Sequence, residues 1–461
     1  MGKRGHVLAI PFPAQGHVTP LLKLSRLIAS HGHFKVTFVN THFIHNKLAA
    51  STDPLDDVVL ASISDGLPDD SDRTDAFELW ESLNSTMSAH LTELIESINA
   101  SNCDEKISCI IADVTLGWVL EIAPRFGAES VGFNPTSAAS FAIILQIPNL
   151  IHQGKLDCDG NLKGSENYVR LADEIPAWRK DEFGWSFPLD LKTQKLLLEC
   201  CLSGEKAARS RSNWLLCNTF YELEPSACDL NPKLLPIGPL LASKTRASCS
   251  SLCVEDMSCI RWLDERAIAS VIYVSFGSLA VLSGRQLQEL ALGLELSGQP
   301  FLWVVRSNFT IDGSKVEYPE GFLERVCGGR GLGKVVEWAP QERVLSHPSV
   351  GCFLSHCGWN STLEGLAEAV PFLCWPYFAD QYHNQSYICD KWKVGLRIEQ
   401  DGDGIRSRDE VKKKIEILVG DDGMRVNALR LKEIAKKSVG QEGSSFVNFH
   451  RFIDHLMVYK G

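Results

Sequence analysis

Short apolar runs alternate with longer mixed segments through the first half of the chain. The runs have strand length, and several are apolar almost throughout, which is typical of strands buried on both faces of a parallel sheet. They lie at residues 6–12, 34–40, 58–64, 107–114, 129–134 and 213–219. Helix-like stretches lie between them at residues 20–30, 75–99 and 116–126. This alternation predicts an α/β domain built on a doubly wound sheet.

The alternation stops once and then restarts. Residues 231–255 hold several prolines and glycines and a Ser/Cys-rich stretch without clear periodicity, which indicates a linker. The second series has strands at residues 270–276, 301–306, 334–338, 351–355 and 372–376, and helices at residues 283–297 and 361–370. An amphipathic helix is predicted over residues 444–458.

These patterns predict two Rossmann-like, doubly wound domains. We expect an N-terminal domain over residues 1–240, a linker over 241–255, a C-terminal domain over 256–440 and a final helix over 441–461 that returns to the N-terminal domain. A chain of 461 residues is comfortable for two domains with sizeable cores. Two such halves facing each other imply a cleft between them, the usual place for a ligand.

Charge and cysteine content exclude several classes of protein. The formal net charge is −11 and the chain has no block of five basic residues, so a nucleic-acid partner is not expected. No apolar run approaches the roughly 20 residues of a membrane span. The N-terminal apolar run is too short for a signal peptide. The 15 cysteines are therefore expected to be reduced, in a cytoplasmic protein.

The densest chemistry lies between Trp338 and Gln381. It reads Trp338-Ala339-Pro340-Gln341, then His356-Cys357-Gly358-Trp359-Asn360-Ser361-Thr362-Leu363-Glu364, then Pro376-Tyr377-Phe378-Ala379-Asp380-Gln381. Residues 351–355 are a predicted strand, and residues 361–364 have the spacing of a capping box that opens a helix. Residues 356–360 then form a loop before a helix N-terminus, where N–H groups and the helix dipole favour a phosphate.

Other side chains of this segment suit the rest of a nucleotide sugar. His356, neutral or protonated, adds a hydrogen-bond donor beside the predicted phosphate loop. Trp338 at another strand end can stack on a base. Asp380 and Gln381, at a third strand-to-helix junction, pair an anionic acceptor with an amide, which suits vicinal hydroxyls.

Simpler interpretations of the same residues stay open. Ser361 and Glu364 can merely cap a helix, and a tryptophan such as Trp338 is more often a core residue. Cys352, His356 and Cys357 lack the paired spacing of a zinc site, so no metal is expected. The glycine-rich residues 328–333 precede a predicted strand, which is the wrong context for a dinucleotide fingerprint.

Two residues of the first half are candidates for acid–base chemistry. His17 follows the first predicted strand in the loop Pro13-Ala14-Gln15-Gly16-His17, and Asp113 ends the strand at residues 107–113. Both belong at the carboxyl edge of a doubly wound sheet, where ligands bind. Asp113 there can orient the imidazole of His17 and stabilise it once protonated, so that His17 acts as a general base. Each residue alone is more often structural.

The 44-residue segment from Trp338 to Gln381 resembles the signature of plant secondary-product UDP-glycosyltransferases, the family 1 glycosyltransferases. Its Trp, Pro-Gln, His-x-Gly-Trp-Asn-Ser, Glu and final Asp-Gln all stand where that signature has them. The likeness covers nearly the full chain, including Gly16-His17-Val18-Thr19-Pro20 and Ile237-Gly238-Pro239. The resemblance implies the GT-B arrangement, with the acceptor bound by the N-terminal domain and the nucleotide sugar by the C-terminal domain.

The resemblance also implies roles for the residues that match the signature. Trp338 would stack on uracil while the Ala339 backbone reads its edge, and Gln341 and Glu364 would hold the ribose. The residues around the diphosphate would be Ser278, His356, Asn360 and Ser361. The residues around the sugar would be Trp359, Asp380 and Gln381, and a final Gln resembles the glucose-preferring members.

His17 matches the family's catalytic base and Asp113 its partner, in the context Asp113 to Trp118. One position departs from the pattern. Many members place Thr or Ser just after the fifth strand to touch the sugar, whereas Pro135 stands there in Phe133-Asn134-Pro135-Thr136-Ser137.

The expected activity is therefore inverting, metal-independent transfer of glucose from UDP-glucose to a hydroxyl of a small, largely apolar acceptor, giving a β-glucoside. UDP-glucose is a substrate, and no tightly bound cofactor is expected. We expect a monomer, with an acceptor pocket near Phe12, Trp118, Phe141 and residues 151–200. Two alternatives stay open: another UDP-sugar donor on the same scaffold, or a non-catalytic protein that binds a UDP-sugar or a small ligand.

Overall fold

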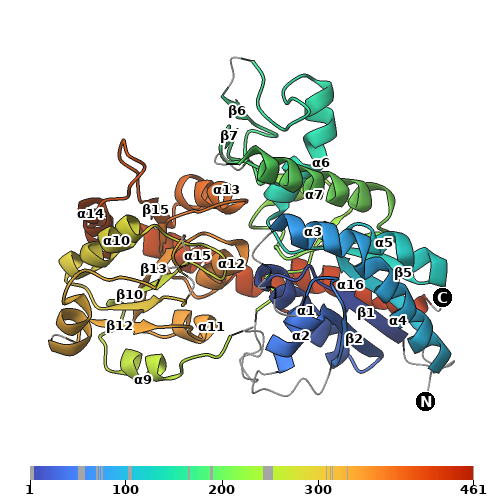
Figure 1. The fold of residues 1–461 in the computed structure, drawn as a ribbon, viewed down its shortest axis with the longest axis horizontal. Coiled ribbons are helices and arrows are strands. Elements are labelled where there is room, and N and C mark those ends of the chain that lie inside the picture. The colour runs from blue at the N-terminus through green and yellow to red at the C-terminus, as the bar shows by residue number, and fades with distance from the viewer. Residues whose placement is uncertain are drawn as a thin grey trace. The chain divides into compact units, whose positions relative to one another are not determined.

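The computed structural model describes most of the chain. The described residues are 5–49, 58–68, 71, 73, 76–101, 106–164, 167–186, 190–241, 253–307, 309–311, 313, 315–329 and 331–459. The chain forms two compact units, the first made of residues 1–252 with 437–461 and the second of residues 253–436 (Figure 1). Of the predicted linker, residues 242–252 lie outside the described residues.

The first unit contains a parallel seven-stranded sheet in the order β3-β2-β1-β4-β5-β8-β9. Its strands are β1 (Gly5–Ile10), β2 (Phe34–Thr41), β3 (Val59–Ile63), β4 (Ile107–Asp113), β5 (Glu129–Asn134), β8 (Trp214–Cys217) and β9 (Leu234–Pro236). Every neighbouring pair is parallel, so all carboxyl ends meet at one edge. The order begins 3-2-1-4-5, which confirms the Rossmann-like prediction.

The first unit also contains helices and a separate two-stranded antiparallel sheet of β6 and β7. They are α1 (Gln15–Ser30), α2 (His42–Ala49), α3 (Ala76–Ser85), α4 (Met87–Ser101), α5 (Val119–Ile122), α6 (Ala138–His152), α7 (Leu191–Ser210), α8 (Pro225–Asp229), β6 (Tyr168–Val169) and β7 (Trp178–Arg179). One apolar cluster joins Val7 and Val36 to α1, and a second joins Leu8 and Ile110 to α4. Alternate residues of the strands therefore feed two cores, one on each face.

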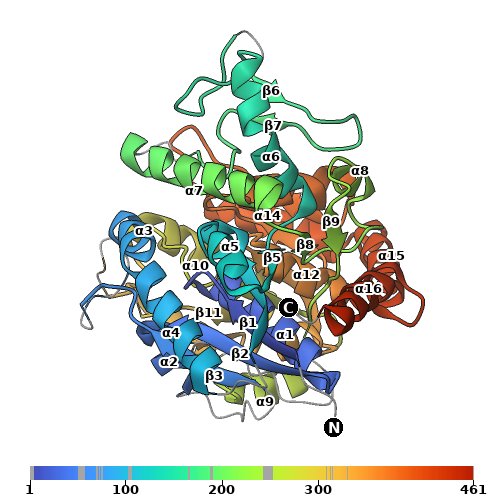
Figure 2. The ribbon, with the colours of Figure 1, turned by 90° about the vertical axis from the view of Figure 1, so that its right-hand side faces the viewer.

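The C-terminal helix α16 (Ser444–Val458) belongs to the first unit (Figure 2). Its residues Phe449, Phe452 and Ile453 join the apolar cluster around α1. The ring of Phe452 meets that of Trp214 edge-on, with the centroids 5.6 Å apart. The predicted return of this helix to the N-terminal domain is confirmed, because burial of its apolar face needs the core of that domain.

The second unit has its own parallel sheet, in the order β12-β11-β10-β13-β14-β15. The strands are β10 (Val271–Ser275), β11 (Phe301–Val304), β12 (Gly333–Val336), β13 (Val350–Ser355), β14 (Phe372–Cys374) and β15 (Gly395–Arg397). The helices are α9 (Ser258–Asp264), α10 (Gly284–Ser297), α11 (Gln341–Leu345), α12 (Trp359–Ala367), α13 (Gln381–Ser386), α14 (Arg408–Val419) and α15 (Asp422–Val439). This order repeats that of the first sheet.

Two boundaries differ from the sequence-based expectation. The helix predicted from Pro20 begins at Gln15, because Pro20 removes one backbone hydrogen bond within α1 without ending it. Residues 234–236, at the start of the aperiodic segment 231–255, form β9 and pair with β8. Three residues are too few to show a hydrophobic period, and Pro236 hides the strand from a pattern search.

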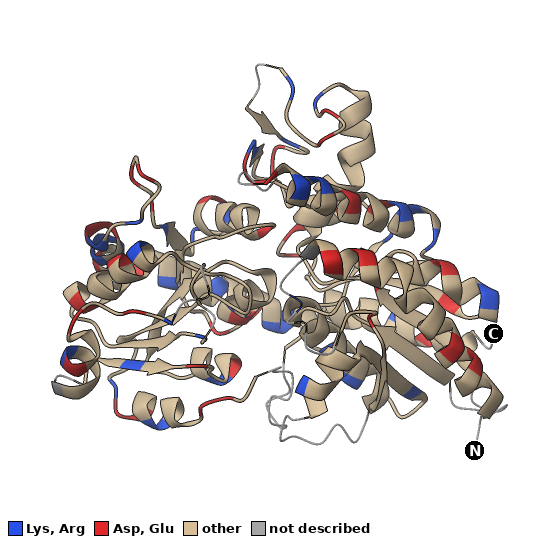
Figure 3. Cartoon of the chain, in the orientation of Figure 1, with Lys and Arg blue, Asp and Glu red and all other residues tan. Residues whose placement is uncertain are grey.

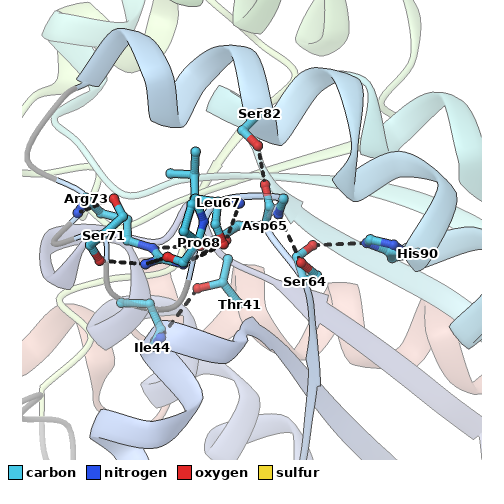
Figure 4. Close-up of polar contacts among 11 residues, drawn as sticks. Thr41, Ile44, Ser64, Asp65, Leu67, Pro68, Ser71, Arg73, Ser82 and His90 are labelled. Atoms are coloured by element: carbon cyan, nitrogen blue, oxygen red, sulfur yellow. Dashed lines mark hydrogen bonds and ion pairs between the residues drawn. The ribbon is translucent and has the colours of Figure 1, made fainter.

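The loop after β3 is organised by a pair of buried charged side chains (Figure 4). Arg73 donates two hydrogen bonds to the carboxylate of Asp65, at 3.2 and 3.0 Å, and also donates to the carbonyl of Pro68 at 2.6 Å. Ser82 of α3 donates to the carbonyl of Asp65 at 2.6 Å. These bonds tie the loop at the carboxyl edge of the first sheet to the helix that follows it.

Both signs of charge are distributed along the helices of each unit (Figure 3). Among the described residues, no helix is long and apolar enough to cross a membrane. Every cysteine that the structure describes is a free thiol.

Candidate active site

Each sheet has one place where the strand order reverses, and the candidate residues gather at both. In the first sheet this place lies between β1 and β4, because the strands after β1 add on one side and the strands after β4 add on the other. In the second sheet it lies between β10 and β13 for the same reason. Connections on opposite sides leave a crevice at the carboxyl ends of such strands, where ligands of this fold bind. His17 follows β1 and Asp113 is the last residue of β4, whereas Ser278 and His356 follow β10 and β13.

The structure brings the imidazole of His17 against the carboxylate of Asp113. Nδ1 of His17 lies 2.7 Å from Oδ2 of Asp113. Asp113 is fully buried, and its Oδ1 accepts a hydrogen bond from the Thr115 backbone N–H at 2.9 Å. Because a carboxylate can only accept, Nδ1 carries the proton of a neutral imidazole and Nε2 carries the lone pair.

His17 lies in the first turn of α1 and not in the predicted loop, since that helix begins at Gln15. Its side chain is 26% exposed, so the ring is accessible although its partner is not. The ring of Phe12 lies beside it, with centroids 5.2 Å apart. A base held on a helix is better fixed in position than one on a free loop.

The loop between β13 and α12 is shorter than predicted. Strand β13 ends at Ser355 and α12 begins at Trp359, with Gly358 as a helix cap that has no side chain. Ser361 and Glu364 therefore lie inside the helix and do not form the predicted capping box. Gly358 makes no side-chain cap hydrogen bond, and a helix N-terminus at the end of a strand is a place where a diphosphate can bind.

His356 is held between two glycines. A Cβ atom at Gly277 would lie 2.7 Å from Nε2 of His356, and one at Gly358 would lie 2.4 Å from the same nitrogen. Only glycine at these positions leaves room for the ring. Burial and the charge of Arg306 lower the pKa of His356 to about 4, so the imidazole is neutral at physiological pH. Its buried Nδ1 has no hydrogen-bond partner among the described residues.

Gln341, the first residue of α11, is the centre of a polar network. Its Nε2 donates to Oγ of Ser361 at 2.9 Å and to Oε2 of Glu364 at 2.7 Å. Its Oε1 accepts from the hydroxyl of Tyr273 on β10 at 3.2 Å. The network brings α11 and α12 together and explains why Ser361 and Glu364 are three residues apart: both face Gln341 from one side of the helix.

Asp380 and Gln381 stand where α13 begins, as predicted. Oε1 of Gln381 accepts hydrogen bonds from the backbone N–H groups of Tyr377 and Phe378, at 2.8 and 3.1 Å. That carbonyl oxygen therefore shapes the preceding loop, and Nε2 stays the candidate donor to a sugar hydroxyl.

The other donor-site candidates lie around these loops. Trp338 is half-buried two residues after β12, and Ala339 is buried behind it. Trp359 is only 4% exposed, and its ring lies beside that of Trp392 at 6.4 Å between centroids. Asn360 is half-buried in the first turn of α12.

The N-terminus of α6, which follows β5, is capped by side chains. Ser137 accepts from the Ser140 N–H at 2.9 Å, and the carboxylate of Glu224 accepts from the N–H groups of Ala138 and Ala139 at 3.0 and 3.1 Å. Burial raises the pKa of Glu224 to about 7. Because these N–H groups are occupied, this helix end is a weaker candidate for an anion site than the start of α12.

The hydroxyls near Pro135 are also engaged locally. Thr136 donates from Oγ1 to Oδ1 of Asn134 at 3.0 Å, and Ser137 is fully buried as the α6 cap. Neither residue is a strong replacement for the hydroxyl residue that the family pattern has at Pro135.

Comparison with known proteins agrees with this geometry. The family model described as "UDP-glucoronosyl and UDP-glucosyl transferase" matches residues 253–441, and the model "Glycosyltransferase, N-terminal domain" matches residues 5–65. UDP-glycosyltransferase 83A1 of Arabidopsis thaliana is 41% identical over 467 residues, covering 98% of this chain and 97% of the relative. The chain belongs to the plant family 1 UDP-glycosyltransferases.

Solved structures of other glycosyltransferases share the fold. Os79 from O. sativa in complex with UDP superposes with a TM-score of 0.82 at 30% identity, covering 98% of this chain and 100% of that one. UGT2 of Phytolacca americana, complexed with UDP-2fluoro-glucose and pterostilbene, also gives 0.82, at 25% identity and the same coverage. The protein is thus a GT-B glycosyltransferase that uses a UDP-sugar as donor.

Three residues of this glycosyltransferase escaped the sequence analysis. Tyr273 completes the Gln341 network. Arg306 donates to the loop that carries Ser278. Asn384 donates to Oδ2 of Asp380 at 3.0 Å and to the Cys357 carbonyl at 2.9 Å. Only Asn384 left a signal, because it stands four residues after Asp380 on one helix face.

Cys352, His356 and Cys357 carry no metal site in this glycosyltransferase. Within the described part of the chain, no group of three or more His, Cys, Asp or Glu side chains is arranged to hold a metal ion.

Proposed function

We propose that this glycosyltransferase moves glucose from UDP-glucose onto a hydroxyl of a small, largely apolar acceptor and leaves a β-glucoside. The observation that carries the proposal is the 2.7 Å contact between Nδ1 of His17 and Oδ2 of Asp113, at the strand-order reversal of the first sheet. Such a pair turns a weak nucleophile into a reactive one by taking its proton.

The proposed chemistry balances without a further reactant. Nε2 of His17 takes the proton of the acceptor hydroxyl, while Asp113 stabilises the imidazolium through Nδ1–H. The acceptor oxygen attacks the anomeric carbon of glucose from the face opposite UDP, and the bond from that carbon to the diphosphate oxygen breaks. UDP leaves with the bonding electrons, and the α-linked donor becomes a β-glucoside.

The donor would be held by the second unit. In this proposal Trp338 and Ala339 hold uracil, and Gln341 with Glu364 the ribose. Ser278, His356, Asn360 and Ser361 surround the diphosphate, and Trp359, Asp380 and Gln381 the sugar. The first turn of α12 and a neutral His356 can stabilise the leaving diphosphate by hydrogen bonds, so the proposal includes no metal ion.

Glucose and an apolar acceptor are supported by different observations. Gln381 at the start of α13, with its carbonyl oxygen held by the Tyr377 N–H, has an amide nitrogen that suits a sugar hydroxyl. The related UGT2 was solved with UDP-2fluoro-glucose and pterostilbene. Phe12 beside His17, and Trp118 near Asp113, supply apolar surface in the first unit. Free thiols support a reducing, cytoplasmic environment, and we propose a monomer.

A donor comparison tests this function directly. The full chain is incubated with pterostilbene or another apolar phenol in buffer containing EDTA. Each reaction also contains one donor: UDP-glucose, UDP-galactose, UDP-rhamnose or UDP-glucuronic acid. UDP release, product mass and the anomeric proton coupling are measured. We expect glucose transfer with β configuration that EDTA does not abolish. Preference for another donor, an α product, or loss of activity that Mg²⁺ or Mn²⁺ restores would contradict the proposal.

A further inference from the structure

Arg306 supports the loop after β10 from the neighbouring strand. It lies two residues beyond the end of β11, which is the neighbour of β10 in the second sheet. Its Nη1 donates to the carbonyl of Ser278 at 2.5 Å, and its Nη2 donates to the carbonyl of Ala280. Both carbonyls belong to residues 276–280, which we call the 276–280 loop. One rigid guanidinium thus fixes two peptide groups of that loop.

This attachment also orients the N–H groups of the loop. In a planar trans peptide the C=O and the following N–H point in opposite directions. Since the carbonyls of Ser278 and Ala280 turn toward Arg306, the N–H groups of Leu279 and Val281 turn away from it. The guanidinium and these donors therefore lie on opposite sides of the loop.

The 276–280 loop connects Arg306 to His356. Gly277 lies against the imidazole, since a Cβ atom there would come within 2.7 Å of Nε2. Burial is the main cause of the low pKa of His356, and the charge of Arg306 lowers that pKa further. A positive potential that disfavours an imidazolium at this position favours an anion at the same position. Burial lowers the pKa of Arg306 itself, yet an arginine stays charged at neutral pH.

We propose that Arg306 is a positioning residue of the donor site that holds the 276–280 loop in place and presents its positive charge, across that loop, to the donor diphosphate. The inference rests on the proposed binding of the diphosphate beside Ser278 and His356. Partial burial makes the charge effective at this short range, because less water screens it.

The charge of Arg306 matters more as the reaction advances. Negative charge on the diphosphate grows while the bond to the anomeric carbon breaks, so a fixed cation stabilises the transition state more than the bound substrate. Loss of Arg306 should therefore lower kcat in addition to weakening UDP, whereas loss of a purely structural side chain would weaken uridine and UDP alike.

The test compares Arg306→Met and Arg306→Lys with Arg408→Met. Arg408 is a matched control, since it pairs with Glu289 between α10 and α14 and has no described contact with the donor loops. Dissociation constants are measured by calorimetry for uridine, UMP and UDP, and the pKa of His356 is followed by NMR. Kinetics with UDP-glucose give kcat and KM, and thermal unfolding reports folding.

We expect Arg306→Met to weaken UDP by at least about tenfold, because the diphosphate loses a nearby positive charge and the 276–280 loop loses two charge-assisted hydrogen bonds, while uridine changes by less than about threefold. The pKa of His356 should rise in Arg306→Met and stay low in Arg306→Lys, which keeps the charge. Arg408→Met should leave all three affinities and the pKa unchanged. If Arg306→Met does not fold, Arg306→Lys tests the inference instead. We expect this variant to have a lower kcat than the wild type while the pKa of His356 stays low.

Three results would overturn the inference. Equal weakening of uridine and UDP in Arg306→Met, or an unchanged pKa of His356, would reduce Arg306 to a structural residue. An Arg306→Lys variant with wild-type kcat would remove the positioning role. Failure of the proposed function is distinguishable, because the wild-type chain would then fail to bind UDP or to transfer glucose, whatever the variants do.

Discussion

Nδ1 of His17 and Oδ2 of Asp113 lie 2.7 Å apart although 96 residues separate them in the chain. They meet because β1 and β4 are neighbours in the first sheet, so that the start of α1 and the end of β4 share one edge. Asp113 is fixed in turn by the N–H of Thr115. The pair is therefore set by the backbone of the sheet.

His17→Ala should lower kcat by at least about 100-fold, which is the typical contribution of a general base. Asp113→Asn should also lower kcat strongly, because an amide placed at Nδ1 can donate to it and favour the wrong imidazole tautomer. UDP affinity should stay within about threefold of wild type in both. The double variant should lose little more than His17→Ala alone, because the two act as a unit. Turnover near wild type for His17→Ala would contradict the mechanism.

Gln381→Glu separates the two roles of Gln381. A carboxylate still accepts from the N–H groups of Tyr377 and Phe378, so the loop should remain, but the Nε2 donor is lost. We expect kcat/KM for UDP-glucose to fall by roughly 10- to 100-fold with little change in thermal stability. Gln381→Ala should in addition lower stability, because two backbone donors lose their acceptor.

In Gln381→His, the imidazole cannot offer a carbonyl and an NH₂ group at the same time. This variant should therefore use UDP-glucose less well and prefer it less strongly over UDP-galactose. The measurements are kcat/KM for UDP-glucose and UDP-galactose, UDP affinity and the melting temperature. A fixed donor ratio in Gln381→Glu and Gln381→His would show that Gln381 only shapes the loop, and the proposal of glucose would lose its main support.

Gly358→Ala should destabilise the protein through the ring of His356. The added Cβ would lie 2.4 Å from Nε2, and Gly277 prevents the ring from moving to its other side. Overpacking of this kind costs about 1–3 kcal/mol. The backbone itself tolerates alanine, since φ at Gly358 is −59°. We expect a lower melting temperature and weaker UDP binding.

The second variant for this test is His356→Ala/Gly358→Ala, which removes the clash. It should recover stability relative to Gly358→Ala without recovering UDP affinity, because the imidazole donor is gone. Additive losses of stability in the double variant would mean that the glycine is needed for some other reason.

Glu224 should make stability depend on pH. Burial raises the pKa of its carboxyl from 4.5 to about 7, so between these values the folded chain binds a proton that the unfolded chain releases. The stabilisation is therefore complete below about pH 4 and is lost as the pH rises through 7. Glu224→Gln stays neutral throughout. From pH 5 to pH 8 the free energy of unfolding of the wild type should fall relative to Glu224→Gln, by at most about 3 kcal/mol.

Chemical denaturation of both proteins at each pH measures this difference, which cancels the titration of all other groups. A difference between the two proteins that does not change with pH would show that Glu224 is ionised across the whole range in the folded state, despite its burial.

Hydrophobic pattern alone determined most of the elements of both sheets. Parallel strands buried on both faces must be apolar along their whole length, so β1, β2, β4 and β5 stand out from the surrounding helices. The amphipathic period likewise marked α16 at its observed bounds. The spacing of residues from Trp338 to Gln381 was enough to indicate a nucleotide-sugar site.

Tertiary structure decided which side chains serve the site and which serve the fold. The spacing of Ser361 and Glu364 fits a capping box, yet both contact Gln341, because α11 packs against α12. Gln381 is predicted to be a sugar ligand, yet its carbonyl oxygen also accepts hydrogen bonds from two backbone N–H groups of the preceding loop. Tyr273 and Arg306 left no local signal, since their partners lie 68 and 28 residues away. Local sequence records burial and helix period, whereas a hydrogen bond depends on which strands become neighbours, and that is settled only when the whole sheet packs.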